Sequence, residues 1–132
     1  MRAFSLFLPL FVAGSLGAAG TDITISSAPP VVVKTVPEAG SAGVDSKTQE
    51  IRVTFSKEMM DSTWSWGEVS HATFPKMPGK PRYEKDKRTC VLPVQLEAGK
   101  TYAIWVNSAN LRNFKDSGGQ SAVPYLLVFK TQ

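Results

Sequence analysis

After residue 30 the chain consists of short segments in which apolar and polar positions alternate, separated by clusters of Gly, Pro, Asp and Ser. Strict alternation over four to eight residues is typical of a β-strand with one buried face. The alternation and the β-branched and aromatic residues predict strands at 31–36, 51–55, 63–69, 89–96, 102–106 and 124–131. The stretch 75–88 contains three prolines and many charges and is expected to be mostly loop.

About seven short strands spaced by about 8–15 residues, with no helical segment of ten residues or more, predict an all-β protein. Antiparallel sandwiches bury one face of each sheet, which explains the alternation. We therefore expect one immunoglobulin-like antiparallel β-sandwich over residues 30–132, preceded by a polar lead-in at 21–29.

The first 20 residues have the order of a secretory signal peptide. Arg2 supplies the positive start, the apolar run 3–12 follows, and small residues reach Ala19 and Gly20, where cleavage is expected. The apolar run is shorter than the roughly 18 residues that span a membrane, and Pro9 interrupts it. The mature chain is expected to be secreted, periplasmic or otherwise in the cell envelope, without a transmembrane segment.

The mature chain is mildly basic. The sequence has 15 basic and 11 acidic residues, a net charge of +4, and removal of Arg2 leaves +3. This charge suits an acidic surface, but it does not indicate a nucleic-acid partner.

Cys90 is the one cysteine of the sequence, so no disulfide forms within the chain. Alternation through 89–96 places it on one face with Leu92, Val94 and Leu96. Because that face is the more apolar, we expect Cys90 to be buried rather than paired with a second chain, unless a bulge at Pro93 reverses the register.

The segment 96–102 contains Leu96, a turn at Gly99 and Tyr102 at the start of a strand. A tyrosine there can return its hydroxyl to the backbone a few residues upstream and close the corner between two sheets. The alternative is an ordinary core aromatic; the glycine at the turn favours the corner.

Several motifs together resemble the bacterial SbsA-type Ig-like domains. They are Pro37 to Gly40 followed by Gly43-Val44, the strand 51–59 with Phe55-Ser56 and Met59, the segment 96–102, the loop 116–120, and the closing Phe129-Lys130-Thr131. Ala98 and Gln120 stand where the family commonly has proline and asparagine. The resemblance covers about 30–132 and implies an Ig-like module of exported bacterial proteins, a spacer or adhesion unit without catalytic residues.

The residues suited to catalysis or metal binding are few. His71 and Cys90 are the sequence's one histidine and one cysteine, too few for a zinc site, and no oxyanion motif accompanies them. Asp45, Asp61 and Asp116 are expected in loops, but without the clustered spacing of a calcium loop they are interpreted as solvated turn residues. We expect no cofactor, no metal and no enzymatic activity.

Two surface features are candidates for ligand binding. Trp64 and Trp66, two residues apart, share a face if they lie in a strand; exposed, they form an aromatic platform for sugar rings, and buried, they are core. One of them is expected in the core, with Trp105 in the opposite sheet. The second feature is the basic segment 76–88, whose local charge is +4; with Tyr83, its candidate residues are Lys80, Arg82, Lys85, Lys87 and Arg88.

Two hypotheses of function follow. The first is an exported, non-catalytic Ig-like module with a structural or adhesion role at the cell envelope. Its partner is not identified by the sequence; an envelope glycan and another envelope protein are the candidates. The alternative is a small carbohydrate-binding protein that uses the tryptophans and the basic segment to hold an envelope glycan.

Overall fold

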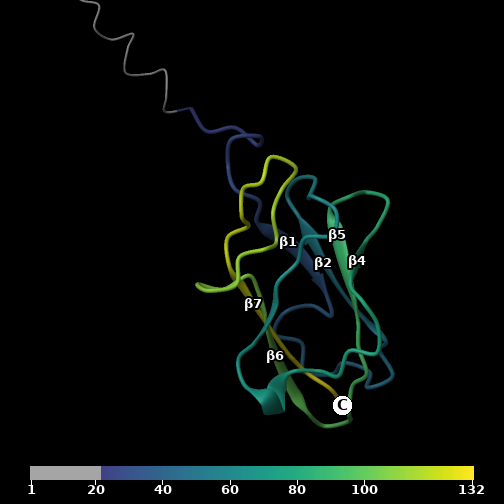
Figure 1. Ribbon diagram of the computed structural model, residues 1–132. Coiled ribbons are helices and arrows are strands. Elements are labelled where there is room, and N and C mark those ends of the chain that lie inside the picture. Colours follow the sequence, from purple (N-terminus) through teal and green to yellow (C-terminus); the bar gives the residue numbers. More distant parts are fainter. Residues whose placement is uncertain (1–21) are drawn as a thin grey trace, which may run out of the picture.

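The computed structural model describes residues 22–132, so the expected signal peptide lies outside the described residues. Two sheets of antiparallel strands pack face to face (Figure 1), which confirms the predicted all-β, Ig-like sandwich. The four-stranded sheet has the order β1 (Val32–Val36), β2 (Glu50–Phe55), β5 (Thr89–Pro93), β4 (Arg82–Tyr83), and the three-stranded sheet has the order β3 (Trp66–Glu68), β6 (Thr101–Val106), β7 (Tyr125–Lys130). A short 3-10 turn, η1 (His71–Thr73), follows β3. Within the described range, no helix is long and apolar enough to cross a membrane.

The core lies between the two sheets. Along β2, Ile51, Val53 and Phe55 are fully buried, while the residues between them face outward and are half-exposed. Burying each such side chain contributes about 1.5–3 kcal/mol. The core cluster of buried residues comprises Val44, Ile51, Val53, Phe55, Met59, Cys90, Leu92, Val94, Tyr102, Ile104, Val106, Phe114, Ala122, Leu127 and Phe129.

The register predicted for the strand around Cys90 is confirmed. Cys90, Leu92 and Val94 all belong to the core cluster, and the pairing of β5 with β2 continues without a bulge as far as Pro93. Val91 points to the other face yet is also fully buried, because its cross-strand neighbours there are Arg52 and Arg82.

Three predicted segments differ from the observed strands. β3 begins only at Trp66, because Ser62 has a φ of 62° and the Thr63 hydroxyl donates to the Met60 carbonyl at 2.7 Å, so the chain still turns there. β5 ends at Pro93, which has no N–H to donate to a ladder. The predicted loop 75–88 contains the two-residue strand β4, too short for an alternation pattern.

The sandwich has two distinct ends (Figure 1). We call the end with the turn 96–101, η1 and the C-terminus the corner end. The opposite end, the loop end, contains the segments 56–63, 84–88 and 107–124, and the lead-in enters the sandwich there.

Candidate functional site

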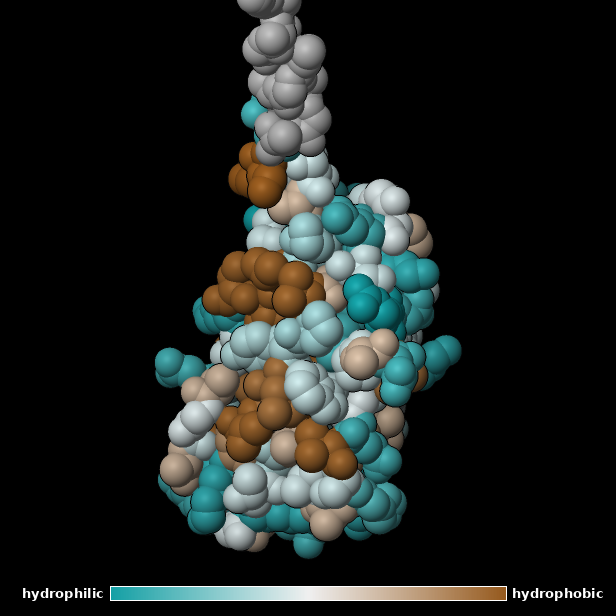
Figure 2. Space-filling model, turned by 90° about the vertical axis from the view of Figure 1, so that its left-hand side faces the viewer, coloured by the Kyte–Doolittle hydropathy of each residue, from teal (hydrophilic) through white to brown (hydrophobic). Residues whose placement is uncertain are grey.

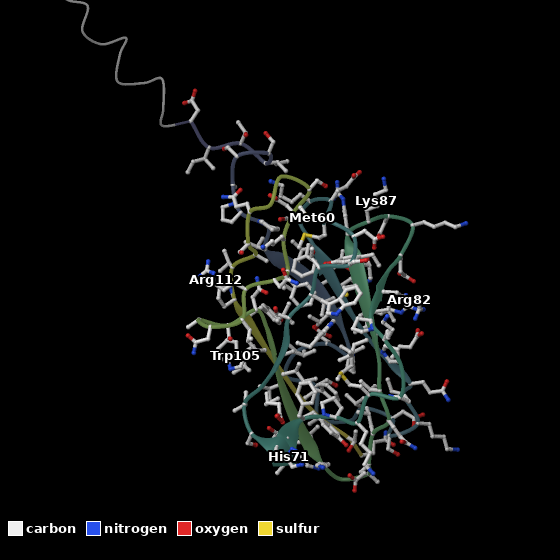
Figure 3. The ribbon with its side chains drawn as sticks, in the orientation of Figure 1. Met60, His71, Arg82, Lys87, Trp105 and Arg112 are labelled. Atoms are coloured by element: carbon white, nitrogen blue, oxygen red, sulfur yellow. The ribbon has the colours of Figure 1, made fainter. Side chains whose placement is uncertain are left out.

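A cleft of about 530 Å³ opens at the loop end, between the segment 58–61 after β2 and the β4–β5 hairpin. Met60, which is 39% exposed, and Tyr83 provide its apolar lining. Lys85 and Lys87 line it from the hairpin. Figure 3 shows Met60 and Lys87 at this same end of the molecule. Three residues predicted from the sequence as ligand-binding therefore meet at one place.

The hairpin tip is shaped by Asp86. One carboxylate oxygen accepts from the backbone N–H groups of Arg88 and Thr89, each at 2.9 Å, and the other accepts from the Thr89 hydroxyl at 2.7 Å. Desolvation alone would raise the pKa of Asp86, but these hydrogen bonds outweigh it and the pKa is lowered. Lys87 takes a φ of 60°, and its carbonyl accepts from the Met59 N–H at 2.7 Å, which joins the two walls of the cleft.

Tyr83 is held rigidly at the cleft. Its hydroxyl donates to the Thr63 carbonyl at 2.7 Å, and its ring centroid lies 6.4 Å from that of Trp64. Burial raises the pKa of Tyr83 above its ordinary value, which favours the protonated phenol that donates this hydrogen bond.

Trp64 and Trp66 are both half-buried and packed against the core cluster. Trp66 meets Phe114 edge-on, with ring centroids 5.2 Å apart, whereas Trp64 precedes β3 and contacts Tyr83. Since Trp64 lies outside the strand, the two rings are not the same-face pair that an uninterrupted strand would produce.

The predicted basic residues are divided between environments. Arg82 lies on the outer face of the four-stranded sheet, 3.0 Å from Glu50 (Figure 3), and that pairing, with the one to Arg52, lowers the pKa of Glu50. Lys80 and Arg88 are exposed outside the cleft lining. The cleft is also lined by three carboxylates, those of Glu58, Asp61 and Glu84. Its chemistry is thus mixed rather than purely cationic.

Cys90 and His71 do not form a nucleophile–base pair. Cys90 has no exposed surface, and burial raises the pKa of its thiol to about 12. The nearby indole N–H of Trp66 lowers the pKa of the thiol by a smaller amount. This N–H makes no hydrogen bond to the sulfur or to any other acceptor. His71 is fully exposed at the corner end (Figure 3), 3.4 Å from Glu68. Within residues 22–132 no group of three or more His, Cys, Asp or Glu side chains could hold a metal ion.

The tyrosine corner is present at the corner end. The Tyr102 hydroxyl accepts from the Glu97 N–H at 2.8 Å, and Gly99 makes the turn between them with a φ of 64°. The Thr131 hydroxyl donates to the Glu97 carbonyl at 2.6 Å. The rings of Tyr102 and Phe129 lie 5.5 Å apart, and Leu96 packs beside the core.

Asp116 is not a solvated turn residue, contrary to the interpretation from the sequence. It is 2% exposed, and its carboxylate lies 2.8 Å from the ammonium of Lys57 while also accepting from the N–H groups of Gly118 and Gln120. Lys57 in turn donates to the carbonyls of Ser26 and Ala28. The pair therefore fastens the lead-in to the loop end. The turn aspartates Asp45 and Asp61 are exposed, as expected.

Asn107 is a buried polar residue that sequence reasoning missed. It is fully buried with a φ of 61°, and its amide nitrogen donates to the carbonyls of Phe114 and Ala122 at 3.1 and 3.0 Å. Its amide oxygen accepts from the Phe114 N–H at 2.9 Å. An asparagine directly after a strand is a turn signal, but nothing in the sequence indicates which carbonyls it binds.

The outer face of the three-stranded sheet is a second feature not anticipated. Trp105 (Figure 3) lies there beside Leu126, which is 40% exposed, and Leu111, which is 49% exposed. The prediction that Trp105 lies in the opposite sheet is wrong, because its strand β6 pairs with β3, which contains Trp66. A Cβ on Gly67 would approach the Trp105 Cβ at 3.3 Å, so glycine admits the indole. The apolar residues on both faces of β7 were the available signal.

A family model described as bacterial Ig-like domain matches residues 26–131. Among solved structures, the chain is similar to the S-layer protein rSbsC(31-844), with a TM-score of 0.51 and 19% identity over 81% of this chain. The N-terminal part of the S-layer protein SbsC gives the same TM-score and identity. The chain spans only 14% and 24% of those two structures, respectively. A search of curated proteins found no match.

Proposed function

Because the chain belongs to the bacterial Ig-like domain family, we propose that it is a non-catalytic structural or adhesion module of the bacterial cell envelope. We place it among the SbsA-type members and assign export to the leader at residues 1–20. The observation that carries the proposal is that polar groups buried wholly or in part form bonds within the sandwich. Asp116, Asn107 and Tyr83 all bind other parts of the sandwich, which suits a rigid module.

The similarity to S-layer structures supports the envelope location. Those neighbours are named as surface-layer proteins, and this domain corresponds to a small part of their length. Fold similarity alone does not carry function. The proposal therefore rests on the combination of the family, the leader and the inward use of the polar groups.

Incubation of the purified protein with fractions of the cell envelope tests the proposal. We expect retention in a wall or outer-surface fraction, with an unrelated β-sandwich protein of similar charge as the control. Absence of binding to every fraction, together with a hydrolase activity that Cys90→Ala abolishes, would overturn it.

A second candidate function is binding of an anionic glycan at the loop-end cleft. Tyr83, Lys85 and Lys87 favour it because they line the same cleft, and an aromatic edge beside ammonium groups suits a charged sugar. The carboxylates of Glu58 and Asp61 restrict such a ligand to one whose negative groups reach the lysines.

Tryptophan fluorescence under a panel of glycans tests this candidate, because Trp64 lies against Tyr83 and reports on the cleft. The double variant Lys85→Ala/Lys87→Ala should lose the response, while Lys47→Ala/Lys130→Ala, which removes the same charge elsewhere, should keep it. An equal loss in both double variants would indicate non-specific charge attraction and reject the cleft as a site.

A further inference from the structure

The lead-in carries a strand-like segment, residues 22–26, which we call the arm. Its sequence alternates polar residues with Ile23 and Ile25, and β-branched residues in alternation favour a strand. Yet Ile23 is 82% exposed and Ile25 is 75% exposed, and neither belongs to the core cluster of the described residues. Two solvent-exposed isoleucines on one segment indicate a surface that packs against a partner.

In this structure the arm is held by local contacts up to residue 25, and Lys57 binds the carbonyl of Ser26 at its end. The Ala28 N–H donates to the Thr24 carbonyl at 2.9 Å, and Thr24 and Ser27 exchange side-chain hydrogen bonds that are exposed to solvent. Exposed hydrogen bonds of this kind contribute little, since water replaces them. The arm can therefore open into an extended strand at small cost.

A groove of about 650 Å³ lies between β1 and the start of β7, lined by residues 32–36, Glu38, Ala39 and Tyr125. β1 and β7 are edge strands of their sheets. The second half of β7 is covered by the segment 40–44, since Gly40 donates to the Val128 carbonyl and Lys130 to that of Ser41. An edge strand beside an uncovered groove is a template for an added strand.

Exposed apolar side chains lie in and near this groove, beside the polar lining residues Lys34, Thr35 and Glu38. Val33 is 60% exposed and Val36 is 45% exposed, and Leu126 on β7 is 40% exposed. Figure 2 shows hydrophobic side chains gathered in patches on the left-hand side of the molecule as it is seen in Figure 1. This surface would cover the two isoleucines of an added arm.

The arm of the same chain is directed away from this groove. Lys57 holds the carbonyls of Ser26 and Ala28, and the Val31 N–H donates to the Ser56 hydroxyl at 3.0 Å. The chain from 26 to 31 is thereby fixed along residues 56 and 57, and the lead-in leaves the sandwich at the loop end (Figure 1). The partner that carries an identical arm is a second copy of this chain.

Charge also distinguishes this pairing from a simple contact between two β1 edges. β1 carries Lys34 on its exposed edge, so two β1 strands side by side would bring two ammonium groups together. The arm carries Asp22 instead, which is complementary to Lys34. Charge therefore disfavours the pairing of two β1 edges and favours the pairing of β1 with the arm.

We propose that residues 22–26 of one copy add as a strand to the β1 edge of a second copy, with Ile23 and Ile25 packed in the groove between β1 and Tyr125. The contact joins two different surfaces, so it either closes as a reciprocal exchange between two chains or continues as an open row.

Sedimentation of the full chain over a range from micromolar to millimolar concentration tests the proposal. We expect concentration-dependent self-association, weakened at least about tenfold by Ile23→Ser/Ile25→Ser, because the apolar area of both side chains is lost from the contact. The matched control is Val69→Ser/Met77→Ser, two exposed apolar residues outside the groove, which should leave association unchanged.

A charge exchange identifies the two surfaces. Asp22→Lys and Lys34→Asp should each weaken self-association, and the variant with both changes should recover it. Asp22, Ile23, Ile25 and Lys34 are all exposed, so circular dichroism should show the folded sandwich in each variant. A chain that stays monomeric throughout, or an association that the arm variants leave intact, would overturn the proposal.

Discussion

The two ends of the sandwich are closed in different ways. At the corner end, Tyr102 binds the backbone of Glu97, only five residues away, and the turn at Gly99 lies between them. At the loop end, Lys57 binds Asp116 across 59 residues, and Asn107 binds Ala122 across 15. The bond of Tyr102 is local and Glu97 is exposed, although Thr131 also binds the Glu97 carbonyl across 34 residues. The loop end is an assembly of buried polar groups that forms only when distant segments meet.

This difference predicts where the fold is most sensitive to a single change. A buried polar group that loses its partner costs the full desolvation of what remains, whereas a half-exposed group turns to water. We therefore expect large effects at the loop end and small ones at the corner end, and the following variants test that ranking.

Asn107→Ala should cause the largest loss. It removes three hydrogen bonds and leaves the Phe114 N–H and the Ala122 carbonyl unpaired in the interior, while the Phe114 carbonyl keeps the Ala122 N–H, at a cost of about 3–4 kcal/mol. Urea unfolding followed by tryptophan fluorescence measures it. Asn107→Gly is the control for backbone conformation, because glycine accepts the φ of 61° without strain. Full stability in the glycine variant would show that the hydrogen bonds contribute nothing.

Asp116→Asn should cost about 2–3 kcal/mol, because the amide still accepts from the N–H groups of Gly118 and Gln120 but leaves the buried Lys57 ammonium without its counter-charge. Desolvation alone would raise the pKa of Asp116; the hydrogen bond and charge of Lys57 and the backbone donors outweigh it, and the pKa is lowered. A lowered folded pKa stabilises the protein above the unfolded value of about 3.9.

That stabilisation is lost as pH falls from about 4 through the lower folded pKa. Unfolding free energies measured across this window should fall with acid in the parent and change less in Asp116→Asn. A parent and variant with parallel acid dependence would show that the carboxylate is not preferentially ionised in the fold.

The same contrast explains what the sequence could predict. Alternation in Ile51, Val53 and Phe55 defines a buried face, and Leu96, Gly99 and Tyr102 define the corner, since both patterns are local. The partner of Asp116 depends on how residues 57 and 116 meet in space, so a turn aspartate could not be distinguished from a buried one.

For the candidate site, the sequence could predict the residues but not their arrangement in space. The charges of Lys85 and Lys87 and the ring of Tyr83 are visible in the sequence, but their meeting with Met60 depends on the pairing of the hairpin with the loop after β2. The arm was visible only as a polar lead-in, because its two isoleucines become notable once the core has formed without them.

Tyr102→Phe should have a smaller effect, about 0.5–1.5 kcal/mol, because the Glu97 N–H loses its acceptor but lies near solvent, while the ring keeps its packing on Phe129. Thermal unfolding monitored by circular dichroism suffices to measure it. A loss as large as that of Asn107→Ala would contradict the ranking of the two ends, and a melting curve identical to that of the parent would argue against the corner.

The Cys90 thiol can report whether the two ends open together, because it is buried between them with its pKa raised to about 12 by desolvation. In the native protein we expect no labelling by a thiol reagent until the chain opens, and no disulfide dimer on a non-reducing gel. If opening is global, labelling accelerates about tenfold for each 1.4 kcal/mol that a variant loses. Asn107→Ala should then react more than 100-fold faster than the parent, and Tyr102→Phe up to about tenfold faster. Acceleration in Asn107→Ala alone, despite a measurable loss of stability in Tyr102→Phe, would show that the loop end opens independently of the corner.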